Sequence, residues 1–407
     1  MLSNQMLLMS HPDVPDSTGI VQAGRAHIVT TVPTSDGWGV FWLRDTTGDL
    51  FNVLLPSTLY YAHVAFDGHI SAGPKALIDI HRHDREPLYM VTWRVDHFGL
   101  LVNELIGTDI FNKITYQYYY DVSIDGQLSA RVGPIRYDLG PSGGIGEIMP
   151  YLDGFMVGVE TTCQGSHQCD YAFKLGDHGV NKGRDLNVVE FDGTHSHSPN
   201  FAYDGSGVVV ISSKDANNQN GGIVSQYISN SGTSITRSTP VIPNHGFLID
   251  SNPDLAWNGN RFAAIWREVE GVTSPLDQNY RMRFATFTRT ASLSTLLSDN
   301  FLEPSYVLAQ YLGRSFGWTT NVSAVSDGWV ASFAQGTSSG PKAAIQHLAI
   351  DGTLKEAWTP FALDDYALHS SVHSTPVYKK TLGIATTHRN GARVEVTFST
   401  LTLACDP

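Results

Sequence analysis

The sequence predicts an all-β fold made of one repeated unit. Helical periodicity is almost absent, and short runs rich in Val, Ile, Phe, Tyr and Trp end at Asp-Gly, Asn-Gly or Ser-Gly turns. One stretch also recurs along the chain. SPNFAYDG at 198–205 returns as NPDLAWNG at 252–259, with looser copies in NVSAVSDG at 321–328, TTVPTSDG at 30–37 and IMPYLDG at 148–154. A pattern that returns at such intervals indicates a fold built from similar sheets.

The clearest unit covers residues 321–363. Its first strand and turn are NVSAVSDG, and the apolar second strand WVASFAQG follows. A third strand with alternating side chains, AAIQHLAIDG, and a fourth, TLKEAWTPFAL, complete the unit. This order predicts a four-stranded antiparallel sheet of the kind that forms one blade of a β-propeller.

The same template fits the chain seven times. The second and third strands of the copies are WGVFWLRD with YYAHVAFDG, LLVNELIG with TYQYYYDVSIDG, FMVGVETT with CDYAFKLGDHG, GVVVISSKDA with GGIVSQYISNSG, RFAAIWREVEG with YRMRFATFTRT, WVASFAQG with AAIQHLAIDG, and LGIATTHRNG with ARVEVTFSTLTL. Seven blades in 407 residues require a spacing of about 50–60 residues, and the copies follow it.

The ends of the chain predict how the ring closes. The seventh copy stops after its third strand, at Leu403, whereas residues 1–24 precede the first copy. We therefore expect a single domain over residues 1–407, in which the N-terminal segment supplies the outer strand of the last blade. Closure of this kind removes the exposed sheet edges that promote aggregation.

With these features the chain resembles the seven-bladed β-propeller superfamily over nearly its whole length. The pattern P-D-x-A-W-N-G, followed by an apolar strand and W-R, is similar to uncharacterised repeats of secreted bacterial propellers. The Trp-Asp ending of WD40 repeats, the kelch double glycine, the sialidase Asp-box and calcium-loop repeats are missing. The resemblance therefore implies a fold and carries no activity with it.

Composition limits the partners. The net charge is −13, only nine residues are lysine, and no basic run occurs, which disfavours a nucleic-acid partner. No apolar run approaches the roughly 18 residues that a membrane span needs. Because lysine is scarce and Asn, Ser, Thr and Gly are common, we expect an extracellular or periplasmic protein whose leader is not present in this chain.

Two of the three cysteines flank a predicted hairpin tip. Cys163 and Cys169 enclose QGSHQ, a spacing that suits a small disulfide loop. Free thiols, or a metal cluster that includes His167, are the alternatives, although zinc would need a fourth ligand. Cys405 stands alone near the C-terminus.

Propeller topology sorts the 16 histidines between two faces. The connections into the inner strands, and the loops between second and third strands, open on one face. On or near that face we expect His27, His81, His83, His167, His195, His197, His245, His369, His373 and His388. His69, His97 and His178 belong to the opposite face, His63 and His347 to third strands, and His11 to the N-terminal segment.

Inner strands surround the propeller axis, where ligands commonly bind. Alignment of the copies on their turns brings polar residues to one inner position: Ser198, Asn252, Asn321 and His373, with Thr30, Thr92 and Glu147 as rougher equivalents. We therefore expect a polar site at the axis, with histidines at its mouth.

Three interpretations of this histidine-rich face remain open. His197 and His373, with His81 or His83, could hold one divalent metal ion, because neutral imidazole is a common ligand. Alternatively, histidine and tyrosine could act as base and acid while arginine neutralises a carboxylate, with His195, His197, His373, His388, Tyr203, Tyr378, Arg267 and Arg389 as candidates. The third interpretation is structural: loop histidines that hydrogen-bond to the backbone.

From these features we expect a secreted enzyme that acts on a carbohydrate or similar polar substrate at an axial, histidine-rich site. It would be a lyase or a hydrolase, with or without assistance from the metal ion. The alternative is a non-catalytic propeller, lectin-like or scaffold, that binds a small molecule, a glycan or a protein.

Overall fold

The computed structural model describes most of the strands of the chain. The described residues are 2–12, 29–45, 56–81, 89–106, 114–136, 147–162, 168–187, 195–215, 222–231, 239–241, 248–249, 253–270, 279–290, 294–302, 306–307, 320–337, 340–362, 370–374 and 381–403. Within these ranges, no helix has the length and apolar character that a membrane crossing needs.

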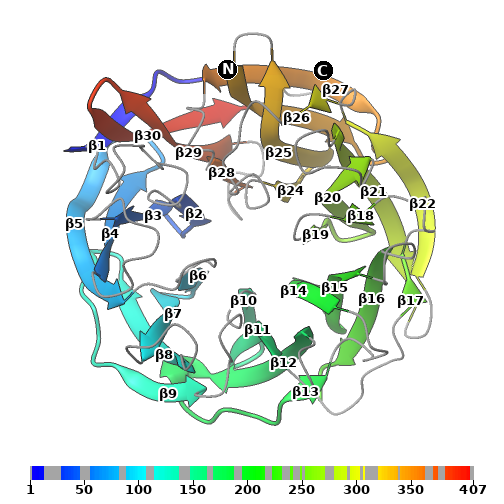
Figure 1. Cartoon of the computed structure of the whole chain (residues 1–407), viewed down its shortest axis with the longest axis horizontal. Helices are drawn as coiled ribbons and strands as arrows, with labels where there is room; N and C mark the ends of the chain where they lie inside the picture. The colour runs from blue at the N-terminus through cyan, green and yellow to red at the C-terminus, as the bar shows by residue number, and fades with distance from the viewer. Residues whose placement is uncertain are drawn as a thin grey trace.

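Seven antiparallel sheets form a closed ring, which confirms the predicted seven-bladed β-propeller (Figure 1). Blade 1 contains β2 (Val29–Pro33), β3 (Gly37–Asp45), β4 (Pro56–Ala65) and β5 (Ile70–His81). Blade 2 contains β6 (Tyr89–Arg94), β7 (His97–Ile106), β8 (Ile114–Ser123) and β9 (Val132–Arg136). Blade 3 contains β10 (Ile148–Tyr151), β11 (Gly154–Thr162), β12 (Gln168–Gly176) and β13 (Leu186–Asn187). Blade 4 contains β14 (His195–Tyr203), β15 (Gly207–Asp215), β16 (Gly222–Ser229) and β17 (Thr239–Pro240). Blade 6 contains β24 (Asn321–Val325), β25 (Gly328–Thr337), β26 (Gly340–Ala349) and β27 (Leu354–Ala362).

Blade 5 departs from the simple four-strand order. Two short segments, β18 (Leu248–Ile249) and β19 (Asp254–Trp257), both pair with β20 (Phe262–Glu270). On the other side, β21 (Asn279–Arg289) pairs with β22 (Ser294–Phe301) and with β23 (Tyr306–Val307). The inner edge of this blade is therefore formed by two pieces.

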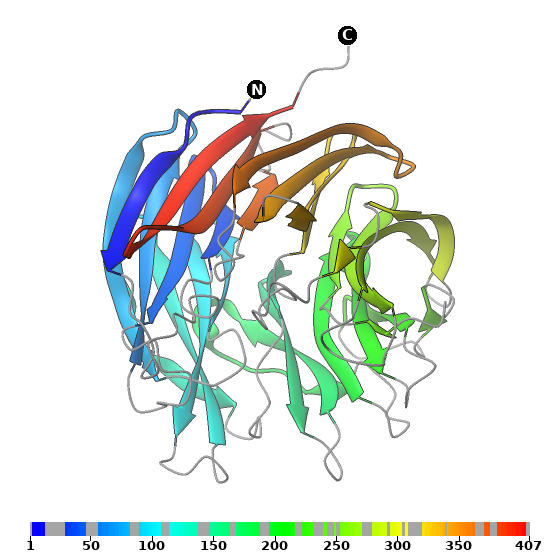
Figure 2. The same ribbon diagram turned by 45° about the horizontal axis from the view of Figure 1, so that its top comes forward.

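The N-terminal strand closes the ring as predicted. Blade 7 has the order β28 (Ser370–Ser374), β29 (Thr381–Asn390), β30 (Arg393–Thr402) and β1 (Met6–Pro12), so its outer strand comes from the opposite end of the chain (Figures 1 and 2). The guanidinium of Arg393 donates to the hydroxyl and the carbonyl of Ser10, both at 2.6 Å. Hydrogen bonds along the sheet and this side-chain contact hold the two ends together.

Each junction between neighbouring blades has its own hydrophobic cluster. The seven clusters join blades 1 and 2, 2 and 3, and so on around the ring to 7 and 1. The run of tyrosines on β8 illustrates why a strand can serve two junctions: Tyr118 and Tyr120 face blade 1, while Tyr119 faces blade 3. Side chains alternate between the two faces of a strand, so each blade of the ring packs against a neighbouring blade on both of its faces. These tyrosine rings therefore contribute to the packing between blades.

The described strands also place the two cysteines that were expected at a hairpin tip. β11 pairs with β12 up to Thr162 opposite Gln168, which confirms the hairpin. Cys163 and the side chain of Cys169 lie outside the described residues, so the disulfide remains a prediction.

Glycines in second strands admit aromatic rings from the next blade. A Cβ built on Gly39 would lie 2.4 Å from the Phe98 ring, and one on Gly99 would lie 2.7 Å from the Phe155 ring. Such distances are shorter than any stable contact between carbon atoms. These two glycines therefore set how closely blades 1, 2 and 3 approach one another.

We expect Gly99→Ala to lower the free energy of unfolding by about 1–3 kcal/mol, because the Phe155 ring must move within a packed core. Replacement of glycine where alanine fits would instead stabilise the protein by about 0.4–1 kcal/mol. Chemical denaturation measures the difference. Gly99→Ala combined with Phe155→Leu, which shortens the opposing side chain, should recover part of the loss, and an unchanged or raised stability in the single variant would contradict this packing.

Candidate functional site

Seven inner strands surround the propeller axis. Each of β2, β6, β10, β14, β19, β24 and β28 contacts the next one around the ring, and β28 contacts β2 (Figure 1). Residues at or beside these strands from different blades therefore meet near the axis.

The backbone places three of the predicted histidines in inner strands. His195 and His197 lie at the beginning of β14, and His373 lies in β28. Their side chains lie outside the described residues, as does the whole of His83. His81 differs from them, because it ends β5, the outer strand of blade 1. With neighbouring strands about 4.8 Å apart, the outer strand lies about 14 Å from the inner one, which separates His81 from the axial histidines.

Tyr203 lies at the opposite end of β14 from the two histidines. Six residues of strand separate it from His197, a distance of about 20 Å. Its hydroxyl donates to the carbonyl of Gly205 at 3.0 Å, and its ring packs edge-on against Tyr151. The structure therefore does not bring Tyr203 to the histidine-rich face, where an acid for His197 would have to be.

The other predicted candidates lie on second strands. His388, near the end of β29, pairs through Nε2 with the Glu395 carboxylate of β30 at 3.2 Å. The position is close to the predicted hairpin loop, but it lies inside the strand. The side chains of Arg267 on β20 and Arg389 on β29 lie outside the described residues. Their proposed role as anion clamps stays a prediction.

Two carboxyl groups in the ring of inner strands, those of Glu147 and Asp254, have the environment expected of acid–base groups. Glu147 directly precedes β10, and its Oε2 accepts a hydrogen bond from the Phe201 amide of β14. Asp254 begins β19, and its Oδ2 accepts from the Val322 amide of β24 at 2.6 Å. Each carboxyl group thus contacts the inner strand of the next blade. β14, which carries His195 and His197, lies between β10 and β19 in the ring.

Both carboxyl groups hold their protons more tightly than usual. Burial raises the pKa of Asp254 to about 7, although hydrogen bonds from the Val322 and Leu255 amides oppose the rise. Burial also raises the pKa of Glu147 well above its ordinary value, and the negative charge of Asp254 raises it further. Both residues keep part of their surface accessible to solvent. A group surrounded by protein yet reachable from solvent can exchange a proton with a bound molecule.

The repeat alignment identified one member of this pair. Glu147 was aligned with the polar inner position, whereas Asp254 was not singled out. The signal for Asp254 was present in NPDLAWNG, where an acidic residue opens an otherwise apolar inner strand. What the sequence does not contain is the amide of Val322, 68 residues further on, which faces its carboxylate.

Comparisons with known proteins show the fold alone. No family model matches the chain, and no curated protein matches its sequence. A protein of unknown function from Dyadobacter fermentans is similar in structure over 98% of this chain and 99% of its own, with 8% identity and a TM-score of 0.53. An α-L-arabinofuranosidase from Fusarium graminearum, bound to an iminosugar inhibitor, aligns over 98% of both chains with 10% identity and a TM-score of 0.49. Trypanosoma rangeli sialidase aligns over 98% of this chain and 59% of its own, with 11% identity and a TM-score of 0.47.

Proposed function

We propose that the protein is an enzyme that acts on a carbohydrate or similarly polar substrate by general acid–base catalysis at the propeller axis. The observation that supports the proposal is the pair of carboxyl groups of Glu147 and Asp254, whose pKa values are both raised, that of Glu147 in part by the charge of Asp254. Titratable groups with strongly perturbed pKa values concentrate at functional sites. The proposal includes an extracellular or periplasmic location.

The two carboxyl groups suit different roles. The pKa of Glu147 is raised well above its ordinary value, which suits a proton donor to a leaving oxygen. Asp254, with a pKa of about 7, loses its proton near neutral pH and is the base that activates water in hydrolysis or removes a proton in elimination. Glycosidases generally use two carboxyl groups in these two roles.

The histidines and arginines complete the proposal around this pair. His195 and His197 begin the strand that lies between the strands of Glu147 and Asp254, and His373 lies on another inner strand. A divalent ion at His197 and His373 would assist the reaction by polarising the substrate. Arg267 or Arg389 would neutralise a substrate anion.

A panel of oligosaccharides and polysaccharides tests the proposal. Release of reducing ends reports hydrolysis, and ultraviolet absorbance of an unsaturated product reports elimination. Once a substrate is found, Glu147→Gln and Asp254→Asn should each lower kcat/KM by about 10²–10⁴-fold, which is the usual contribution of a general acid or base.

Asp153→Asn is the matched control, because Asp153 is exposed in the turn between β10 and β11, at the far end of the same inner strand as Glu147. It should retain full activity. Glycan binding without turnover, unaffected by the two substitutions, would overturn the proposal in favour of a lectin-like propeller.

A further inference from the structure

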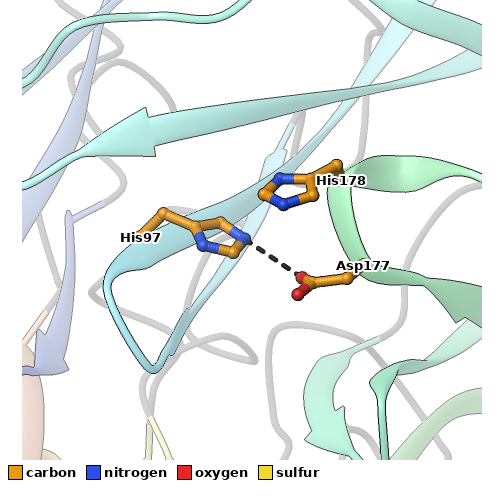
Figure 3. Close-up of side chains that lie close together, drawn as sticks. All are labelled: His97, Asp177 and His178. Carbon is orange, nitrogen blue, oxygen red and sulfur yellow. Dashed lines mark ion pairs between the residues drawn. The ribbon is translucent and has the colours of Figure 1, made fainter.

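A second group of chemically reactive side chains lies on the opposite face from the predicted histidine-rich mouth. His97 begins β7 of blade 2, just after the turn that follows β6. Asp177 and His178 lie in the 3-10 turn η2 (Asp177–Gly179), directly after β12 of blade 3. Potential ligand atoms of the three side chains all lie within 4.8 Å of one another, although the residues come from different blades (Figure 3).

The hydrogen bonds of His97 determine which ring nitrogen carries its proton. Nδ1 lies 2.9 Å from Oδ1 of Asp96, and a carboxylate can only accept, so Nδ1 carries the hydrogen. In the neutral ring, Nε2 then presents a lone pair. That atom lies 3.3 Å from Oδ1 of Asp177 and 3.4 Å from Oδ1 of Asp121. The lone pair of Nε2 therefore faces two carboxylate oxygens that cannot donate to it, although Arg94 lies beside Oδ1 of Asp177 and the Tyr119 hydroxyl donates to Oδ1 of Asp121. Nε2 of the neutral ring thus gains no hydrogen bond from the atoms that it faces.

Burial makes this arrangement more costly. The side chain of His97 is only 9% exposed. Among the described residues, its Nε2 and Oδ1 of Asp177 are buried and have no hydrogen-bond partner. A polar atom in that position costs about 1–3 kcal/mol when nothing satisfies it. The two atoms face each other across 3.3 Å (Figure 3).

His178 repeats the arrangement of His97. Its Nδ1 lies 2.9 Å from Oδ2 of Asp121, so that nitrogen also donates to a carboxylate and Nε2 is left with the lone pair. The ring stacks on that of His97, with centroids 4.9 Å apart. A histidine whose Nδ1–H is held by a carboxylate is the usual form of a metal-binding histidine, because the carboxylate orients the ring and makes Nε2 more basic.

Charge around the group favours a divalent cation. Asp96, Asp121 and Asp177 contribute −3, and Arg94, whose Nε lies 3.2 Å from Oδ1 of Asp177, contributes +1. The sum is −2 with both imidazoles neutral. Ligand atoms about 2.0–2.2 Å from a tetrahedral zinc ion are themselves about 3.3–3.6 Å apart, which matches the 3.3 Å between His97 and Asp177.

We propose that Nε2 of His97, a carboxylate oxygen of Asp177 and Nε2 of His178 bind a divalent transition-metal ion of the Zn²⁺ type, which links blade 2 to blade 3. Asp96 and Asp121 orient the two imidazoles, and water completes the coordination. The site is separate from the axial carboxyl groups and does not depend on the proposed enzymatic activity. Its role is structural, since the ion adds to the contacts by which the two sheets already meet: side-chain packing, the hydrogen bonds of Arg94 to the Leu152 and Gly154 carbonyls, and ion pairs.

Zinc titration of the full chain, stripped of metal and followed by calorimetry, tests the site. We expect one Zn²⁺ per chain at this site, in addition to any ion at His197 and His373, and a higher thermal midpoint when zinc is present, because a ligand that binds only the folded state stabilises it. Asp96→Asn should weaken binding by about 10–100-fold, as loss of a carboxylate behind a ligating histidine does elsewhere. His178→Ala removes a ligand and should weaken binding by more than about 100-fold. Both side chains are exposed, so these variants should fold.

His69→Gln is the matched control. His69 pairs with Asp67 and lies in the connection of blade 1 that corresponds to the position of His178 in blade 3. Its substitution should leave zinc binding unchanged. His197→Ala should also leave zinc binding at this site unchanged, whereas it would abolish the binding of an ion held at the axis. Failure of the wild type to bind zinc, or equal binding by wild type, His178→Ala and Asp177→Asn, would overturn the proposal.

Discussion

Asp254→Asn should make the protein more stable at pH 8 than the wild type, although it removes a proposed catalytic base. The pKa of Asp254 is raised from 3.8 to about 7, mainly by burial. Between these values the unfolded chain has released the proton and the folded chain retains it, so the wild type loses stability as pH rises through this window. Above pH 7 the folded protein contains a buried charge. Asparagine has no such charge, and its carbonyl still accepts from the Val322 amide.

The size of the effect follows from the shift. Each pKa unit corresponds to about 1.4 kcal/mol, and partial solvent exposure of Asp254 reduces the total. We expect the difference in unfolding free energy between Asp254→Asn and wild type to grow by about 2–4 kcal/mol from pH 4 to pH 8. Urea denaturation at several pH values measures it. Groups that do not interact with Asp254 cancel, since both proteins contain them, whereas loss of the Asp254 charge also lowers the pKa of Glu147 and so adds to the difference in the same direction.

Glu147→Gln should show the same direction, because burial and the charge of Asp254 both raise the pKa of Glu147. A protein that gains stability when a residue is neutralised retains that residue for another reason, and chemistry at the site is the usual one. If Asp254→Asn is instead less stable than wild type at every pH, the carboxylate is a structural acceptor for Val322, and the acid–base proposal loses its main support.

Most of the fold could be predicted because its determinants are local. Alternating side chains and Asx-Gly turns specify each hairpin within about ten residues, and seven repeats leave one compact arrangement. Ring closure also followed from counting, because one strand was missing at Leu403 and one segment was unassigned near Met6. The split inner edge of blade 5 was not predicted, since β18 is too short to have a pattern of its own.

The candidate site was less predictable, because the strand topology indicates on which face of the propeller a residue lies and does not give the distance between two residues on that face. Sorting by connections placed His195, His197 and His373 by strand, but it ignored how far a residue lies along or across a sheet. That is why Tyr203 and His81 are separated from them. His97 and His178 were both assigned to the opposite face, as observed. The contact of His97 and His178 with Asp177 depends on two turns of unrelated sequence that lie together at the junction of blades 2 and 3. An alignment of the repeats does not show which turns lie together.

Acid should loosen the closure of the ring through His11. This residue lies on β1, the strand that joins the N-terminus to blade 7, and it is buried. Trp42 of blade 1 donates from Nε1 to Nε2 of His11 at 3.1 Å, so Nε2 must be unprotonated. The pKa of His11 is lowered from 6.5 to about 4, mainly by burial and also by the positive charges of Arg44 and Arg393. Protonation would replace an acceptor by a donor that faces another donor.

The sign of the pH dependence follows from these two values. Above pH 6.5 neither state is protonated, and the folded protein has its full stability. Between pH 6.5 and about 4 the unfolded chain binds a proton that the folded chain does not. The unfolding free energy therefore decreases as pH decreases, by about 3 kcal/mol between pH 6.5 and pH 4. Burial also lowers the pKa of His63, on β4 of blade 1, which adds a loss in the same direction.

His11→Gln separates the two contributions, because the Gln carbonyl can accept from Trp42 and does not titrate. Between pH 7.5 and pH 4.5, we expect the wild type to lose about 2–3 kcal/mol more unfolding free energy than His11→Gln. Hydrogen exchange should locate the difference in β1 and in its partner β30, where amide protection falls first in the wild type. Equal losses in both proteins would mean that His11 takes up its proton without disturbing the strand. The closure would then depend on the packing of Leu8 and the contacts of Arg393 with Ser10, which do not change charge in this range.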